Sequence, residues 1–189
     1  SSGKMGFSIA RAAQAAGASV TLVAGPVHLP TPRGVQRINV QSARDMLAAV
    51  QSALEDVSIF IAAAAVADWR PADFSAKKIK KDGSGAVPSL AFVENPDILA
   101  TVANSDRAQQ GQLYCVGFAA ESDNLLAHAS AKRVRKNVPL LVGNIGPATF
   151  GQDDNTLLLI DAHGSSVLPR ASKAQLGHAL IAEIARRLP

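Results

Sequence analysis

The chain has 189 residues, of which 48% are hydrophobic and 18% are charged, so it has enough apolar material to bury a sizeable core. Its apolar runs are shorter than the roughly 20 residues that span a bilayer, and its first residues lack the apolar block of a signal peptide, which argues against a membrane protein. A single cysteine, Cys115, excludes an internal disulfide framework and a multi-cysteine metal cluster, and we expect a reducing, cytoplasmic location. The net charge of +4 is too small by itself to indicate nucleic-acid binding.

The first third of the chain alternates between helical spacing of apolar residues and compact apolar runs typical of buried strands. We predict, in chain order, a helix over 5–16 ended by Gly17, a strand over 19–24, an extended loop over 28–34, a strand over 35–40, a helix capped by Ser42 and a strand over 58–66. The last strand tapers to alanines, and small side chains at the end of a central strand allow a ligand to approach the backbone closely.

After residue 66 the composition changes to polar and charged residues. We predict a long functional loop over 67–85, because this segment directly follows the strongly apolar strand over 58–66. After it we predict a short strand over 87–93, a helix opened by residues 95–97 and running to 103, a strand over 114–118, a helix over 121–137, strands over 140–142 and 156–160, a hairpin through Gly164 into 166–168, and a final helix over 172–187.

Strands separated by helices predict an α/β fold, which we expect to be a three-layer, Rossmann-like domain with a mostly parallel sheet and an antiparallel edge near the C-terminus. Ligands of such sheets bind outside the C-terminal ends of the strands. The candidate ligand surface therefore comprises residues 62–70, 118–121 and 142–146.

The opening segment, residues 1–6, is a small and polar stretch ahead of a helix and partly resembles nucleotide-binding motifs. It is not a Walker A loop, because Met5 follows Lys4 and no glycine stands upstream. Short-chain dehydrogenase chemistry needs a Tyr with a Lys four residues later, whereas Phe118 stands at that spacing from Tyr114. The N–H groups of such a turn suit either phosphate binding or ordinary capping, and the residues alone do not decide between them.

Basic residues form two clusters, one of four lysines over 77–81 and one in a helix over 132–136. Either cluster alone is typical of a solvated face. Together they could neutralise a triphosphate, since each charged hydrogen bond to phosphate contributes roughly 1.5 to 3 kcal/mol. Nucleic acid is the competing anion, but aromatic residues for stacking do not interleave with these charges.

Two acidic residues are well placed, Asp68 after a central strand and Asp97 at a helix start. Either carboxylate could accept from ribose hydroxyls or hold Mg²⁺ through water. Asp97 also has a structural interpretation, because an acidic residue in a first helical turn complements the helix dipole. The four histidines are scattered without metal-ligand spacing, and Cys115, inside an apolar strand, is expected to be a packed thiol.

Six segments, read in order, resemble the bacterial phosphopantothenoylcysteine synthetases, which often form the C-terminal half of a bifunctional coenzyme A biosynthesis protein. The matching segments are residues 1–6, 63–70, 78–81, 95–98, 117–121 and 132–137. The resemblance implies a single ligase domain over 1–189, a homodimer, and fusion to or association with a flavin-dependent decarboxylase. It also implies a family strand and a catalytic Asn upstream of residue 1, so we expect an N-terminally truncated domain that binds CTP without necessarily completing catalysis.

The activity that the resemblance implies is a Mg²⁺-dependent ligation that uses CTP. The carboxylate of 4′-phosphopantothenate attacks the α-phosphate, which forms an acyl-cytidylate and releases pyrophosphate. The amine of L-cysteine then displaces CMP and gives the amide, 4′-phosphopantothenoylcysteine. Such a site must neutralise a triphosphate and keep water from the acyl phosphate.

The same resemblance assigns roles to individual residues. Lys78 is the catalytic candidate, which contacts the phosphates and the intermediate, while the Mg²⁺ ligands remain unassigned. The binding candidates for CTP or 4′-phosphopantothenate are Ser1 and Gly3 in the anion-binding turn, Ala62, Ala63 and Ala64 through their backbone, Asp68 at the nucleotide or its metal, Asn95, Pro96, Asp97 and Ile98 as the ribose and base loop, Phe118 beside the base, and Lys132 and Lys136 at the phosphates.

Two other functions stay open on the sequence. One is a Rossmann-type NAD(P)-binding oxidoreductase, and the other is a noncatalytic nucleotide-binding module. Stabilisation by NADPH but not by CTP with Mg²⁺ would favour the first, and a silent ligation assay would favour the second.

Overall fold

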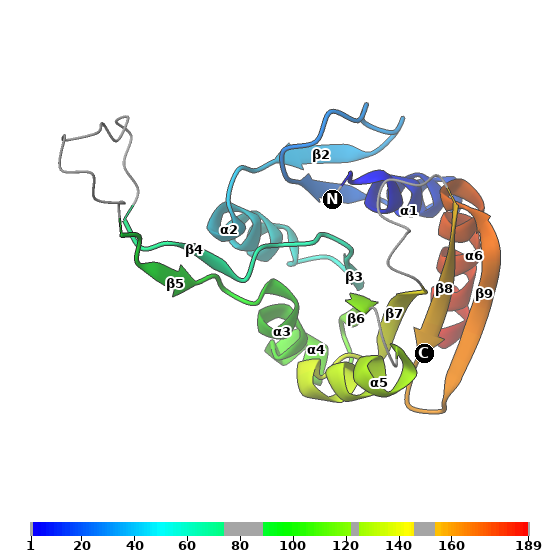
Figure 1. Ribbon diagram of the computed structural model, residues 1–189. Coiled ribbons are helices and arrows are strands. Elements are labelled where there is room, and N and C mark those ends of the chain that lie inside the picture. The colour runs from blue at the N-terminus through cyan, green and yellow to red at the C-terminus, as the bar shows by residue number, and fades with distance from the viewer. Residues whose placement is uncertain (1, 74–88, 122–124, 146–153, 189) are drawn as a thin grey trace.

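Helices cover both faces of a central sheet in the computed structural model, which describes residues 2–73, 89–121, 125–145 and 154–188 (Figure 1). The helices are α1 (Lys4–Ala15), α2 (Ala43–Ala53), α3 (Ile98–Ala103), α4 (Asp106–Gln109), α5 (Leu125–Lys136) and α6 (Lys173–Arg187). The strands are β1 (Thr21–Ala24), β2 (Gln36–Asn39), β3 (Ile59–Ala62), β4 (Trp69–Pro71), β5 (Phe92–Glu94), β6 (Tyr114–Glu121), β7 (Leu140–Ile145), β8 (Asp154–Ile160) and β9 (Ser165–Ser172). Within the described ranges, every helix is too short or too polar to cross a bilayer.

The five-stranded sheet has the order β3-β6-β7-β8-β9. β6 pairs in parallel with β3 and β7, whereas β8 and β9 are antiparallel, as a tight hairpin requires. The parallel centre and antiparallel C-terminal edge confirm the predicted sheet. Strands β1 and β2 form a separate parallel pair, and β4 and β5 form an antiparallel ribbon.

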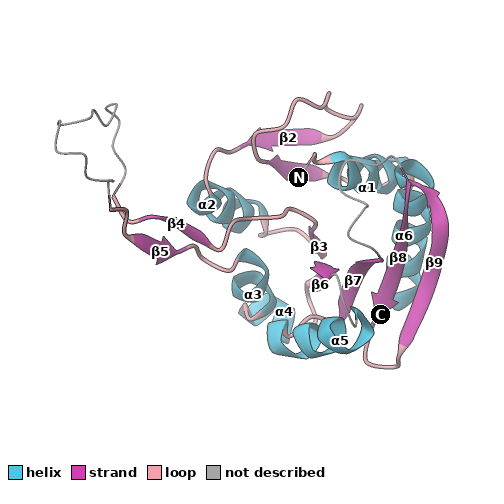
Figure 2. Cartoon of the chain, viewed as in Figure 1, coloured by secondary structure: helices cyan, strands magenta, loops and turns pink. Residues whose placement is uncertain are grey.

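Alternation along β6 divides the core into two halves. Cys115 and Ala119 face a cluster that includes Ile98 and Val102 of α3 and Ala129 of α5, with Val50 of α2. Val116 and Phe118 face the opposite cluster, which contains Ile9 of α1 and Leu176, Leu180 and Ile184 of α6. Successive side chains of a strand point to opposite faces, so a strand that is apolar at every position must be covered twice. Figure 2 shows this arrangement, with α3 and α5 on one side of the strands and α6 on the other.

Helix ends follow the predicted signals closely. Ser42 and Ser172 each form a capping box with the residue three positions later, Asp45 and Gln175. Gly17 follows α1 with a φ of 91°, the left-handed conformation that a glycine adopts without strain. These local signals are why α1 and α6 lie within one or two residues of their expected ranges, and why α2 begins directly after Ser42.

Several expectations about the elements were wrong, among them the strand expected over 87–93, which within the described residues begins at Phe92. The region 67–85 is not loop throughout, because Trp69–Pro71 is β4, and the strand expected over 58–66 ends at Ala62. Glu121 belongs to β6 rather than to a helix, since it pairs with Ile145, and the short helix α4 was not expected. In each strand the deciding factor is a partner distant in sequence, which local spacing does not reveal. Residues 74–81, which include Lys78, lie outside the described residues.

The packing of α6 on α1 depends on the absence of a side chain at Gly177. A Cβ at this position would lie 2.8 Å from the Ser8 carbonyl oxygen and 3.0 Å from its carbon. These are backbone atoms, so a larger residue must push one helix away from the other. The close approach also brings the N-terminal turns of the two helices together.

We therefore expect Gly177→Ala to destabilise the protein by about 1 to 3 kcal/mol, because overpacking outweighs the gain of about 1 kcal/mol from helix propensity. Gly6→Ala is the matched control, since a Cβ on Gly6 of α1 would meet only Ala63 at an ordinary 3.9 Å. Urea unfolding measures both variants. Stabilisation of both variants would show that the helices do not depend on this contact.

Candidate functional site

The C-terminal ends of the parallel strands form one edge of the sheet, where the sequence predicted a ligand surface. β3 ends at Ala62, which pairs with Gly117 of β6, and Phe118 of β6 pairs with Val142 of β7. The start of α1 reaches the same edge, because Gly6 packs near Ala63. Ala62 and Ala63 are half-buried and Ala64 is exposed, so the end of β3 offers backbone with little side-chain cover.

The turn before α1 is formed by Gly3, whose φ of 74° is left-handed. A Cβ there would lie 3.2 Å from Val27 Cγ1, so both conformation and space favour glycine. No described side chain caps this helix, whereas α2, α3, α4 and α6 each have a capping side chain. Its first N–H groups are therefore available to an anion, as in helix N-termini that bind phosphate. Ser1 lies outside the described residues.

A network of hydrogen bonds joins β4 and the two residues before it to the loop before α3. The Asn95 N–H donates to the Asp68 carbonyl oxygen at 2.7 Å, and Asn95 Nδ2 donates to the Ala67 carbonyl oxygen at 2.9 Å. The Arg70 guanidinium donates to the Glu94 carbonyl and, at 3.2 Å, to Asn95 Oδ1. Asp68 and Asn95, predicted separately from sequence, are thus brought together.

Asp97 has the structural role considered from the sequence, while its ligand role stays a prediction. Its Oδ1 accepts a hydrogen bond from the Ala100 N–H at 2.9 Å, which caps α3. Its Oδ2 pairs with Lys136 Nζ of α5, which joins two predicted site residues. The carboxylate is partly exposed, so the ion pair contributes at most about 1 kcal/mol. Lys136 can therefore exchange this partner for a phosphate at small cost.

The remaining candidates are more dispersed. Pro96 and Ile98 flank Asp97. Ile98 is the first residue of α3 and is buried in the core. Phe118 packs with the α1 and α6 core, on the opposite face of the sheet from Ile98. Lys132 is half-buried on α5 and interacts with other groups of the chain. The structure thus joins Asp68 to Asn95 and Asp97 to Lys136 as two contacting pairs, and leaves Phe118 beside the end of β3 near Ala63.

Metal and thiol chemistry can be assessed for the described residues. They contain no group of three or more His, Cys, Asp or Glu side chains that could hold a metal ion. Mg²⁺ commonly uses one or two carboxylates together with substrate phosphates, so the exposed Asp68 is sufficient as a protein contribution. Burial raises the pKa of the Cys115 thiol to about 11, which leaves it protonated and confirms it as a packed thiol.

Two polar residues at this edge were not singled out from the sequence. Arg70 follows Asp68 by two positions, and an arginine after a strand gives no signal of which carbonyl it will reach. Asn155 of β8 is buried, and its Nδ2 donates to Asn144 Oδ1 of β7 at 2.9 Å. This pair fixes the side chain of Asn144 at the end of β7, because a buried amide needs a partner.

We expect Arg70→Gln to loosen the β4–β5 ribbon, since the guanidinium adds hydrogen bonds to Glu94 and Asn95 beyond the backbone pairing of the two strands. Hydrogen exchange of the Ala72 and Asn95 amides, which bond to Ala91 and Asp68, should become about tenfold faster. Arg44→Gln, an exposed change on α2, is the control. Equal exchange in both variants would remove Arg70 from this network.

Comparison with known proteins gives a consistent result. Residues 1–188 match the family described as DNA/pantothenate metabolism flavoprotein C-terminal domain. The coenzyme A biosynthesis bifunctional protein CoaBC of Escherichia coli K12 is 46% identical over 191 residues, which cover 99% of this chain and 46% of that protein. The counterpart from Vibrio cholerae is 45% identical over 184 residues, 96% of this chain and 45% of that protein. The chain therefore spans less than half of the length of these relatives.

Solved structures agree with this match. The crystal structure of the C-terminal domain of a coenzyme A biosynthesis bifunctional protein CoaBC superimposes with a TM-score of 0.80 and 32% identity, covering 100% of this chain and 84% of that chain. The likeness extends over the whole chain, including its antiparallel C-terminal edge.

Proposed function

We propose that this chain, which belongs to the DNA/pantothenate metabolism flavoprotein C-terminal domain family, is a ligase domain that joins 4′-phosphopantothenate to L-cysteine in coenzyme A biosynthesis. The observation that carries the proposal is the identity of 46% over 191 residues to a coenzyme A biosynthesis bifunctional protein. At this identity, over nearly the whole chain, the fold and the main site residues are generally shared. We propose a cytoplasmic location, as expected for an enzyme of this kind with a reduced, buried cysteine.

We propose that CTP activates the carboxylate. The carboxylate oxygen of 4′-phosphopantothenate attacks the α-phosphorus, the bond to the bridging oxygen breaks, and pyrophosphate leaves. The amine of cysteine then attacks the acyl carbon of the cytidylate, CMP leaves, and the amine loses a proton. Overall, one amide forms and one CTP becomes CMP and pyrophosphate, so a single site must accommodate a triphosphate and two further substrates.

The features that support this proposal lie at the ligand edge, by which we mean the edge of the sheet formed by the C-terminal ends of β3, β6 and β7 together with the start of α1. The uncapped start of α1 supplies N–H groups for phosphate oxygens, and the alanine end of β3 allows the nucleotide to lie against the backbone. Asn95, held by Arg70 and Ala67, presents the ribose and base loop. Lys136 reaches the phosphates by leaving Asp97, and Lys132 and Lys78 are the further cations.

Mg²⁺ accompanies the triphosphate in this proposal and supplies charge neutralisation at the phosphates. Asp68 is the described carboxylate directly before β4 and would hold the ion through water. The role of this chain's own residues is to bind and orient the reactants and to keep water from the acyl phosphate.

We further propose a homodimer whose subunits meet through the β4–β5 ribbon. Trp69, Phe92 and Val93 of this ribbon, and Leu90 just before β5, are large apolar residues and are exposed. The ribbon extends away from the central sheet (Figure 1), and a two-stranded ribbon alone is only marginally stable in water. A second copy would cover these side chains. The flavin-dependent decarboxylase is the proposed fused partner, in line with the bifunctional relatives.

The ligation itself is tested on a version extended at its N-terminus by the segment that precedes residue 1 in the bifunctional relatives. With CTP, Mg²⁺, 4′-phosphopantothenate and L-cysteine, it should release pyrophosphate and form the amide. Lys78→Gln should lower kcat by about 100-fold, because a phosphate contact is lost, with little change in Tm. Arg44→Gln should behave as the parent does. Absence of pyrophosphate release would contradict the ligase, and an unchanged kcat would remove Lys78 from the site.

For the dimer, Phe92→Asp should shift the protein from dimer to monomer in light scattering, because a charge would be buried at the interface. Val167→Asp on β9 is the matched control, since Val167 is 55% exposed and Phe92 57%. A parent protein that is monomeric at micromolar concentration, or dimers in both variants, would rule out the ribbon as the interface.

A further inference from the structure

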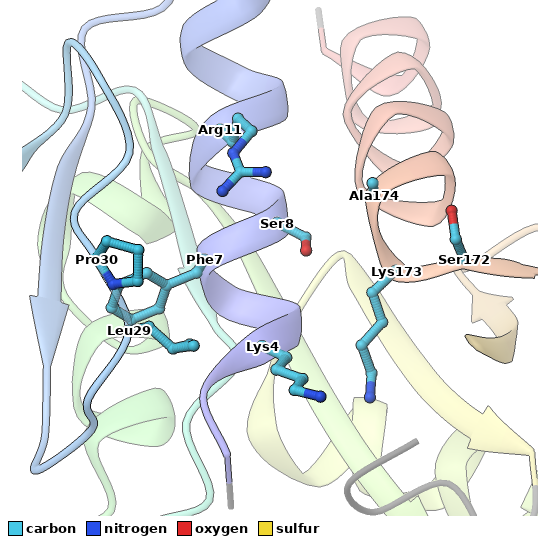
Figure 3. A pocket seen from close by; sticks show the side chains of 9 residues that line it. All are labelled: Lys4, Phe7, Ser8, Arg11, Leu29, Pro30, Ser172, Lys173 and Ala174. Carbon is cyan, nitrogen blue, oxygen red and sulfur yellow. The ribbon is translucent and has the colours of Figure 1, made fainter. Parts of the chain in front are cut away.

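A cavity of about 270 Å³ lies between α1, α6 and the loop that leads to β2. Figure 3 shows the side chains around it. The lining residues are Lys4, Phe7, Ser8, Arg11, Leu29, Pro30, Ser172, Lys173 and Ala174. Neither Asp68, Asn95 nor Phe118 lines this cavity, so it is distinct from the edge network that joins Asp68 to Asn95.

The charge of the lining is entirely positive. Lys4, Arg11 and Lys173 are cationic, and the lining contains no acidic residue. Lys4 and Arg11 lie on one face of α1 with Ser8 between them, at helical spacings of four and three. In Figure 3 the ammonium ends of Lys4 and Lys173 point to the same end of the cavity, although the two residues come from opposite ends of the chain.

Lys173 is held in place by packing and is not a freely moving surface lysine. Only 9% of Lys173 is exposed, an uncommon degree of burial for a lysine. The capping box of Ser172 orders the turn that carries it, and the contact at Gly177 holds this turn against α1. A buried ammonium is stable only with anionic or hydrogen-bonding groups nearby. Asp154 is one such group, since Lys173 contributes to lowering the pKa of its carboxyl, after the hydrogen bond from Arg170.

The opposite wall is also held in place. Arg37 of β2 donates to the carbonyl oxygens of Leu29 at 2.7 Å and Val27 at 3.1 Å. Its guanidinium also lies 5.1 Å from the centre of the Phe7 ring, which fastens the loop to α1. The cavity therefore has two fixed walls, an apolar side formed by Phe7, Leu29 and Pro30, and cations along the α1 and α6 side.

We propose that this cavity binds a phosphoryl anion of the pyrophosphate class. Its volume lies just below the roughly 300 to 1,000 Å³ of pockets that hold drug-sized ligands, which favours a small anion over a whole nucleotide. Three cations and the Ser8 hydroxyl match the many acceptor oxygens of a diphosphate. Lys4 and Lys173 also interact with other groups of the chain, and the anion would share or replace these partners. This inference rests on the proposed function for the identity of the anion, because pyrophosphate is the product of the proposed ligation and Lys4 belongs to the opening segment; Arg11 and Lys173 are the residues that it adds.

The test is isothermal titration of the protein with inorganic pyrophosphate, without nucleotide or Mg²⁺, at constant ionic strength. Arg11→Gln and Lys173→Gln should each weaken pyrophosphate binding by about tenfold, since each removes a charged hydrogen bond. Lys173→Arg keeps the charge and should retain most of the affinity. Arg44→Gln on α2 is the control and should bind as the parent does.

Arg11 is exposed, so its variant should fold even if Lys173→Gln does not, and circular dichroism checks both. Absence of pyrophosphate binding to the parent, or equal binding by Arg11→Gln and Arg44→Gln, would overturn the proposal. Phosphate and sulfate titrations distinguish a diphosphate site from a general oxyanion site, and stronger binding of sulfate would also overturn it. Because no ligation step is measured, these outcomes are independent of the ligase assay.

Discussion

The parallel pairing of β6 with β3 and β7 is the constraint on which the rest of the structure depends. It buries β6 on both faces, and it brings three strand ends to one edge. A small residue at Gly117 suits this packing, because a Cβ there would lie 2.6 Å from Leu99 Cδ2 of α3 and 2.8 Å from Leu141 Cδ1 of β7, and both leucine side chains would have to move. The absence of that side chain lets α3 lie close to the sheet, and the position of α3 determines where Asn95 and Asp97 meet their partners.

The candidate site follows from this placement, because its contacts join segments that are far apart in the chain. Asn95 reaches back to Asp68 and Ala67 over nearly thirty positions, and Asp97 reaches forward to Lys136 over 39. Each contact lies on the α3 side of the sheet, whereas Phe118 and the start of α1 lie on the α1 and α6 side. A ligand that touches both groups must therefore cross the edge at the end of β3, where the alanines leave the backbone uncovered.

The sequence was sufficient to predict the longer helices and the class of fold, but not the short helix α4, because caps and apolar spacing are local. Ser42, Ser172 and Gly17 carry this information within a few residues of the ends that they determine. The β4–β5 ribbon and the length of β6 were not predictable in the same way, since each depends on a partner strand elsewhere. For the site, residue types indicated Asp68 and Asn95, but not that Arg70 would bond to Glu94 and Asn95, because one arginine can reach many carbonyls.

The hairpin of β8 and β9 explains why α6 contributes to the ligand edge at all. β8 runs away from this edge, with Ile160 opposite Leu141, and β9 returns to it, with Ser172 opposite Asp154. α6 therefore begins where β7 ends, and its first residue lies beside the first residue of α1. If a helix followed β8 directly, it would begin at the opposite edge, about a strand length away. The antiparallel strands β8 and β9 add no parallel strand end to this edge. They do place the buried Lys173, at the start of α6, on the side of the sheet where anions are expected.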